Sequence, residues 1–229
     1  MTAAYRDDLA FIHHAGFSEF AESAARGLLE ILWRHEIREG LVIDVGCGSG
    51  VLARELTQTG FDVLGIDASP SMIAIARTVA PRARFEVGSF DAIDLPPCDA
   101  IVSMGEVLNY ASLDAVSRLL TRARTRLIIC DVAERGAYPP HDERRVEGED
   151  WSVIAIKDSD GVRLTRRILT FRMRGGTMQR DEEVHTLELY ERATLTALFR
   201  TYGYRVTVRR SYRTRRLPKG HAVYIAVRA

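Results

Sequence analysis

Short apolar strands alternate with helices between residues 41 and 132, and this alternation limits the chain to few folds. The strand-like runs are 41–46, 62–67, 84–89, 99–105 and 126–132. The helix-like segments between them are 51–60, 69–80 and 113–123. Strands that are apolar on both faces are typical of a parallel sheet with helices on both sides. The sequence therefore predicts an α/β fold with a doubly wound, Rossmann-like sheet.

The segments that flank this core have other patterns. One apolar stripe with helical spacing runs through 17–37, at Phe17, Phe20, Ala24, Leu28, Ile31 and Leu32. Three strands separated by the turn signals "DSDG" and "RGG" are indicated within 151–190 and predict an antiparallel meander. A helix over 191–203 then precedes a terminal strand pair, which would complete a mainly parallel, seven-stranded sheet with an antiparallel C-terminal strand.

We expect a single domain over 1–229. Its expected parts are an N-terminal helical cap (1–40), a core (41–132), an antiparallel β insertion (145–190) and a final helix and strand pair (191–229). A chain of this length can bury a large core without disulfides or metals. Whether it is a monomer or a homodimer is left open by the sequence.

The charge balance and the cysteines exclude several classes of protein. Lys and Arg number 32 against 31 Asp and Glu, so no global attraction to nucleic acid or to an anionic membrane is expected. No apolar run reaches the eighteen residues of a membrane span, and the acidic start does not resemble a secretory signal. Cys47, Cys98 and Cys130 are too scattered for a metal cluster. We expect a cytoplasmic protein without a metal.

Three glycines, Gly46, Gly48 and Gly50, follow the first strand at once. Ligands of parallel sheets bind at the carboxyl ends of the strands, and glycine lets a ligand touch the main chain there. A dinucleotide fold requires the spacing G-x-G-x-x-G, whereas "GCGSG" is one residue shorter. The preceding Asp44 would repel a pyrophosphate but would suit a cationic amine. The loop thus favours an amino-acid-bearing cofactor over a dinucleotide.

Four motifs in this order resemble the class I S-adenosylmethionine-dependent methyltransferases of the small-molecule type. They are "VIDVGCGSG", "GIDASPSMIAIAR", "FEVGSF" and "CDAIVSMGEVLNY". The resemblance implies S-adenosyl-L-methionine as cofactor. Asp44 and the three glycines would surround its methionine part, and Asp67 would bind both ribose hydroxyls. Ala68, Met72, Ser89 and Phe90 would border the adenine, and Met104 would lie near the sulfonium.

The sequence departs from the family pattern at two places. Many relatives have an acid where this chain has Ser89, so that adenine recognition would rest more on backbone groups. The fifth strand follows "RARTR" and not the usual Pro-Gly-Gly turn. Met72 and Met104 could equally be ordinary core residues.

Three segments could contact the methyl acceptor. One is the antiparallel insertion, which resembles a substrate-covering lid; its Trp151, Tyr190 and His185 could supply contacts, although a structural role suits each of them better. The N-terminal segment would lie across the cofactor, with Tyr5 and His14 as substrate contacts and His13 as a general base, because imidazole titrates near neutral pH. Both histidines could instead cap or pack a helix. After the fourth strand, we expect Glu106 to act in catalysis and Asn109 or Tyr110 to contact the substrate.

The expected function is methyl transfer to an oxygen or nitrogen of a small molecule by direct displacement. Most of the rate enhancement can then come from positioning, so a dedicated base is not obligatory. Three alternatives stay open: an RNA methyltransferase that uses the Arg-rich strands, a cofactor-binding protein without transfer activity, and a dinucleotide-dependent oxidoreductase.

Overall fold

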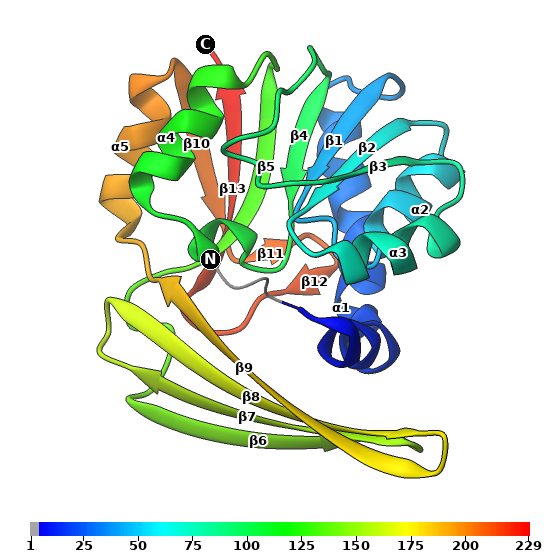
Figure 1. The fold of residues 1–229 in the computed structure, drawn as a ribbon. Coiled ribbons are helices and arrows are strands. Elements are labelled where there is room, and N and C mark those ends of the chain that lie inside the picture. The colour runs from blue at the N-terminus through cyan, green and yellow to red at the C-terminus, as the bar shows by residue number, and fades with distance from the viewer. Residues whose placement is uncertain (1–4) are drawn as a thin grey trace.

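The computed structural model describes residues 5–229, which form a seven-stranded sheet, a four-stranded sheet and five α-helices (Figure 1). In chain order the elements are α1 (Asp7–Arg34), β1 (Leu41–Val45), α2 (Val51–Gln58), β2 (Asp62–Asp67), α3 (Pro70–Val79), β3 (Arg84–Val87), β4 (Ala100–Ser103), the short 3-10 helix η1 (Val107–Tyr110), α4 (Leu113–Arg122), β5 (Leu127–Ala133), β6 (His141–Glu147), β7 (Trp151–Ser159), β8 (Arg163–Arg174), β9 (Thr177–Glu188), α5 (Arg192–Thr201), β10 (Tyr204–Arg209), β11 (Ser211–Tyr212), β12 (Arg215–Arg216) and β13 (His221–Arg228).

The large sheet has the strand order β10-β13-β5-β4-β1-β2-β3. Strand β13 runs antiparallel to both of its neighbours, and all other pairs are parallel. The order reverses beside β1, because β2 lies on one side of it and β4 on the other. This is the position at which a parallel sheet binds its ligands. The structure confirms the predicted seven strands, their mainly parallel arrangement and the antiparallel C-terminal strand.

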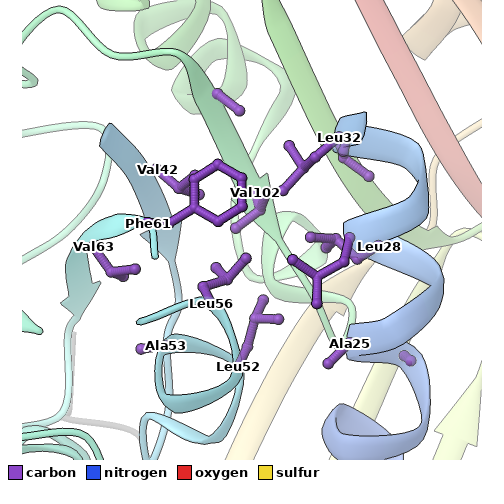
Figure 2. Packing of buried hydrophobic residues seen from close by; sticks show 14 of the residues in the cluster. Ala25, Leu28, Leu32, Val42, Leu52, Ala53, Leu56, Phe61, Val63 and Val102 are labelled. Atoms are coloured by element: carbon purple, nitrogen blue, oxygen red, sulfur yellow. The ribbon is translucent and has the colours of Figure 1, made fainter. Parts of the chain in front are cut away.

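Both faces of the large sheet are buried. Alternate residues of β1 point to opposite faces, so that Val42 joins a core with α1, α2 and α3 whereas Ile43 joins a core with α4 and α5. Figure 2 shows the first of these cores, in which Leu28 and Leu32 of α1 meet Leu56 of α2. The packing fixes the helices, and with them the loops at the carboxyl edge.

Helix α3 begins as the sequence predicts. The Ser69 hydroxyl accepts a hydrogen bond from the backbone N–H of Met72 at 3.1 Å, and Pro70 occupies the first turn. The N-terminal helix differs from the expectation, because α1 begins at Asp7, ten residues before the apolar stripe at Phe17. Phe17 itself is 39% exposed, so the stripe that reaches the core begins later.

The small antiparallel sheet has four strands where the sequence predicted three. The additional strand β6 pairs with β7 over His141–Glu147, a stretch that reads as a loop because its residues are mostly charged. This edge strand is exposed along most of its length, so no apolar alternation marks it. We call the sheet β6–β9 the lid sheet, because it lies beyond the carboxyl edge of the large sheet (Figure 1).

In the part of the chain that the structure describes, no helix has the length and apolar character needed to cross a bilayer.

Candidate active site at the carboxyl edge of the sheet

The glycine loop between β1 and α2 has a left-handed backbone at all three predicted positions. Gly46, Gly48 and Gly50 have φ values of +69°, +53° and +77°. A Cβ at Gly46 would overlap the side chain of Val107, and one at Gly50 would crowd Ala76. At Gly48 no described atom lies within 4 Å of such a Cβ. Gly46 and Gly50 are therefore required by the fold, while Gly48 leaves its backbone open to a ligand.

Asp44 is a buried acid at the end of β1. It is 1% exposed, and its Oδ2 has no hydrogen-bond partner among the described residues. Burial, and then the charge of Asp67, raise the pKa of Asp44 to about 7. An unpartnered buried carboxylate is costly, and a cationic group beside it would remove that cost. The geometry therefore fits the ammonium group of an amino-acid-bearing ligand.

Asp67, at the end of β2, closes the other side of the loop. Its carboxylate accepts hydrogen bonds from the backbone N–H groups of Gly48, at 2.9 Å, and Ser69, at 2.8 Å. Burial raises the pKa of Asp67, and these two bonds oppose the rise. A carboxylate offers about four acceptor positions, so two remain for a pair of hydroxyl groups. This arrangement fits a ribose diol.

Some of the residues predicted to border the adenine belong to the hydrophobic core. Met72 and Phe90 are buried, at 2% and 9% exposure, whereas Ala68 is exposed. The hydroxyl of Ser89 donates a hydrogen bond to Asp91, which also binds Arg118. These contacts lower the pKa of Asp91, Ser89 first and then Arg118. A carboxylate thus lies two residues beyond the position at which the family pattern has its acid.

The turn after β4 is held by a second buried acid, Asp131 of β5. Its carboxylate accepts the backbone N–H groups of Gly105 at 2.8 Å and Glu106 at 3.1 Å, and the hydroxyl of Tyr212 at 2.6 Å. Burial raises the pKa of Asp131 to about 6. Glu106 has a φ of +61°, a conformation that costs a non-glycine residue free energy. Asp131 holds the strained turn that follows Met104.

Glu106 lies at the centre of a charged cluster that joins the large sheet to the lid sheet. Its carboxylate accepts hydrogen bonds from Tyr138 and His221, both at 2.8 Å, and from Arg166 of β8 at 2.5 Å. Although burial opposes ionisation, the charge of Arg166 and the bond from His221 lower the pKa of Glu106 to about 2. Glu106 is therefore ionised at neutral pH and is a weak proton acceptor.

A second cluster joins the N-terminal segment, η1 and the lid sheet. The Tyr110 hydroxyl lies 3.2 Å from Nδ1 of His185 and 3.4 Å from the hydroxyl of Tyr5. Nε2 of His185 lies 2.9 Å from a carboxylate oxygen of Glu183. Glu183 also accepts the backbone N–H groups of Tyr5 and Arg6, at 2.7 and 2.8 Å. Three distant parts of the chain therefore meet here.

The two predicted histidines of α1 differ in surroundings. His13 is half-buried, and its buried Nδ1 has no partner among the described residues; burial followed by the charge of His14 lowers the pKa of His13 to about 4. Its ring lies edge-on to Tyr5, with 5.2 Å between the centroids. His14 instead has its Nδ1 3.0 Å from the hydroxyl of Ser49, in the glycine loop. Only His13 lies with the tyrosine cluster.

The structure brings Tyr5, His13 and Tyr110 together and places Glu106 in the other, charged cluster, but it assigns Asn109 another role. Asn109 is fully buried, and its amide bonds the backbone N–H and C=O of Ala133 and the C=O of Glu188. It ties η1 to β5 and to the end of β9, so it is not available to a substrate. The substrate contact predicted for Asn109 is wrong for that reason.

Sequence reasoning missed several residues of these clusters. They are Asp131, Tyr138, Arg166, Glu183 and His221. A usable signal was the pattern Glu183–x–His185 in an otherwise alternating strand, because residues two apart in a strand share a face. Both side chains are buried, at 5% and 4% exposure. Two buried polar residues on the core face of a strand need partners on the facing element.

The comparison with known families concerns the core. Residues 42–128 match the model of a family described as "Methyltransferase domain". This match spans less than half of the chain. The match covers the glycine loop, both acids and the turn after β4, and it ends before the lid sheet.

Curated relatives match part of this chain and part of their own length. A magnesium-protoporphyrin O-methyltransferase of Rhodobacter capsulatus is 33% identical over 105 residues, which is 42% of this chain and 46% of the relative. A ubiquinone biosynthesis O-methyltransferase of Acinetobacter baumannii is 42% identical over 69 residues, 28% of this chain and 29% of the relative. The chain thus matches less than half the length of these relatives.

Solved structures extend the likeness over nearly the whole chain. An S-adenosylmethionine-dependent methyltransferase from Clostridium acetobutylicum has a TM-score of 0.82 at 13% identity, covering 96% of this chain and 97% of the other. A sugar N-methyltransferase from a Streptoalloteichus species has a TM-score of 0.81 at 17% identity, covering 100% and 97%. At these identities the likeness establishes the fold. The resemblance to class I methyltransferases is confirmed at that level.

Proposed function

We propose that the protein binds S-adenosyl-L-methionine at the carboxyl edge of the large sheet and transfers its methyl group to an oxygen or nitrogen of a small molecule. The observation that carries the proposal is the pair of acids, buried Asp44 and half-buried Asp67, on either side of the open backbone of Gly48. When bound, the cofactor supplies an electrophilic methyl group on a sulfonium.

The roles of the residues around the cofactor follow from their surroundings. Asp44 would hold the ammonium group and Asp67 the ribose diol, with Ala68, Met72, Ser89 and Phe90 around the adenine. Met104 would lie near the sulfonium, since it precedes the turn that Asp131 holds. These assignments are proposals that combine the motif resemblance with the geometry described above.

On the acceptor side, Tyr5 and Tyr110 are the substrate contacts that the geometry favours. The catalytic roles of His13 and Glu106 stay predictions. With a pKa of about 4, His13 is neutral but weakly basic, and with a pKa of about 2, Glu106 is permanently charged. Glu106 is better suited to orient a cationic or hydrogen-bonding group than to accept a proton.

Proton release on ligand binding tests the cation site directly. The pKa of Asp44 is about 7 in the ligand-free protein. At pH 6 most of the molecules therefore carry a protonated Asp44, and an ammonium group that favours the carboxylate will expel that proton. We expect release of up to about one proton per S-adenosylhomocysteine bound at pH 6 and almost none at pH 8.5. Calorimetric titrations in two buffers of different ionisation enthalpy measure the difference.

The Asp44→Asn variant should abolish the proton release and lower the affinity. Asp94→Asn, the same change at an exposed acid, is the matched control and should alter neither. The sign for stability also follows: a raised pKa means that the folded state holds its proton more tightly than the unfolded chain. The contribution of Asp44 to the free energy of unfolding therefore falls as the pH rises from about 4 to about 7, and Asp44→Asn should flatten that fall.

Asp67→Ala tests the second acid and should remove ligand binding. Retention of full affinity in both aspartate variants would contradict the proposed site. Release of S-adenosylhomocysteine in the presence of phenols and amines then distinguishes a transferase from a protein that only binds the cofactor.

A further inference from the structure

We propose that Tyr110, His185 and Glu183 form a proton relay that removes the proton of the methyl acceptor. The inference rests on the proposed methyl transfer and deepens it, because it places a general base on the lid sheet and not on α1. The three side chains form a continuous hydrogen-bonded series with separations of 3.2 Å and 2.9 Å.

The fold places the relay through strand register. Glu183 and His185 are two residues apart on β9 and therefore face the same side, toward the core. In the lid sheet, Arg166 of β8 is the register partner of His185, and its side chain bonds Glu106. Tyr110 is the last residue of η1, whose first residue, Val107, fills the space beside Gly46. The relay thus begins one helical turn from the glycine loop.

The hydrogen bonds determine the tautomer of His185. A carboxylate only accepts hydrogen bonds, and Glu183 already accepts two backbone N–H groups. Nε2 of His185 must therefore carry the hydrogen that it donates to Glu183. In the neutral ring Nδ1 is then an acceptor, so the Tyr110 hydroxyl donates to it. The oxygen of Tyr110 keeps lone pairs, which accept from the hydroxyl of Tyr5 or from a group that takes its place.

The direction of these hydrogen bonds determines the path of the proton. As the acceptor O–H or N–H bond breaks, its proton passes to the Tyr110 oxygen while the Tyr110 proton passes to Nδ1 of His185. The acceptor electron pair forms the new bond to the methyl carbon, and the carbon–sulfur bond breaks with its electron pair left on sulfur. His185 ends as an imidazolium beside the Glu183 carboxylate, which stabilises it. Charge and atoms balance without another reactant.

Neither of the other candidate bases has an equivalent arrangement. His13 has no partner for Nδ1 among the described residues and no carboxylate that would stabilise its charged form. The carboxylate of Glu106 is already bound by Arg166, Tyr138 and His221. Of these three candidates, His185 alone has both an oriented donor on one nitrogen and a buried carboxylate on the other.

The tautomer can be tested on the intact protein without a known acceptor. With ¹⁵N-labelled histidine and saturating S-adenosylhomocysteine, NMR of the wild type should show His185 neutral and protonated on Nε2, its signals being assigned with His185→Gln. Tyr110→Phe should shift the Nδ1 resonance, and Glu183→Gln, which replaces the carboxylate acceptor, should shift the Nε2 resonance. Glu182→Gln is the matched control, because this neighbouring acid is exposed and bonds Arg180. A His185 protonated on Nδ1 would overturn the relay.

The kinetic test uses a panel of phenols, read as release of S-adenosylhomocysteine. Tyr110→Phe and His185→Gln should reduce turnover about 10²–10⁴-fold at pH 7, with S-adenosylhomocysteine affinity unchanged within about twofold. The loss should shrink as the pH exceeds the pKa of the phenol, because solvent then removes the proton. A merely structural role would give a loss that does not vary with pH, and that result would refute the relay. Absence of cofactor binding in the wild type would instead refute the proposed function.

Discussion

At the scale of single residues, the glycine loop separates the demands of folding from those of binding. Gly46 and Gly48 both have positive φ, but only at Gly46 would a Cβ overlap a neighbour, Val107. A left-handed alanine costs ~1–2 kcal/mol in either case. We expect Gly46→Ala to lower the free energy of unfolding by more than this amount, because of the overlap with Val107. Gly48→Ala should lower it by ~1–2 kcal/mol at most, yet should weaken S-adenosylhomocysteine binding at least tenfold.

Chemical denaturation and calorimetry on the same preparations measure both quantities. Gly60→Ala is the control, because Gly60 has a φ of +97°, no described atom lies near its Cβ position and it is remote from the loop. It should reproduce the stability cost of Gly48→Ala with unchanged affinity. Equal affinity for Gly48→Ala and the wild type would mean that no ligand approaches this backbone.

At the scale of elements, α1 is locked to the hairpin β11–β12 by a close backbone approach. A Cβ at Gly27 would overlap the carbonyl oxygen of Tyr212. Gly→Ala inside a helix normally stabilises it by ~1 kcal/mol. For Gly27→Ala we instead expect the free energy of unfolding to fall by ~1–3 kcal/mol, because the added methyl group overpacks this contact. Thermal denaturation measures the change.

We also expect Gly27→Ala to disturb the candidate active site. The Tyr212 hydroxyl bonds Asp131, whose carboxylate holds the turn at Gly105 and Glu106. We expect Gly27→Ala to weaken ligand binding although Gly27 is not among the residues proposed to hold the cofactor. Arg26→Ala, at the exposed neighbouring position, should change neither stability nor affinity appreciably. A stabilised Gly27→Ala protein would show that the backbone contact is not rigid.

Elements with a strong local pattern could be predicted from the sequence, and elements without one could not. The Ser69–Pro70 start of α3 and the acids at the ends of β1 and β2 depend on neighbours in the chain, so local spacing predicts them. Strand β6 is exposed and charged, so its pairing with β7 leaves no apolar signature. The approach of Tyr110 to His185 joins residues 75 positions apart, and only the fold brings them together.

At the scale of the whole molecule, the balance of charge bears on the class of substrate. Net charge is +1, and several arginines of the Arg-rich segments 162–174 and 204–219 pair with acids, as in Arg166–Glu106, Arg174–Asp8 and Arg213–Glu30. Phosphate binding requires free cations, so a nucleic-acid substrate is not expected. Fluorescence anisotropy with a labelled RNA dodecamer at 150 mM salt should show a Kd no tighter than ~10⁻⁴ M.

The salt dependence of RNA binding is the control for that measurement. If few arginines contact phosphates, the logarithm of the RNA association constant should fall only slowly with the logarithm of the salt concentration. Micromolar or tighter RNA binding with a steep slope would favour the RNA methyltransferase alternative, and the Arg-rich strands would then be its binding surface.

The lid sheet is one uninterrupted stretch of chain between β5 and α5. The residues proposed to hold the methyl donor all precede it, and the proposed proton acceptor lies inside it. The two halves of the proposed chemistry therefore lie in separate stretches of the chain, and the sequence of one can be replaced without altering the other. Grafting a relative's insertion onto this core is the corresponding route to a new acceptor preference with the donor site left intact.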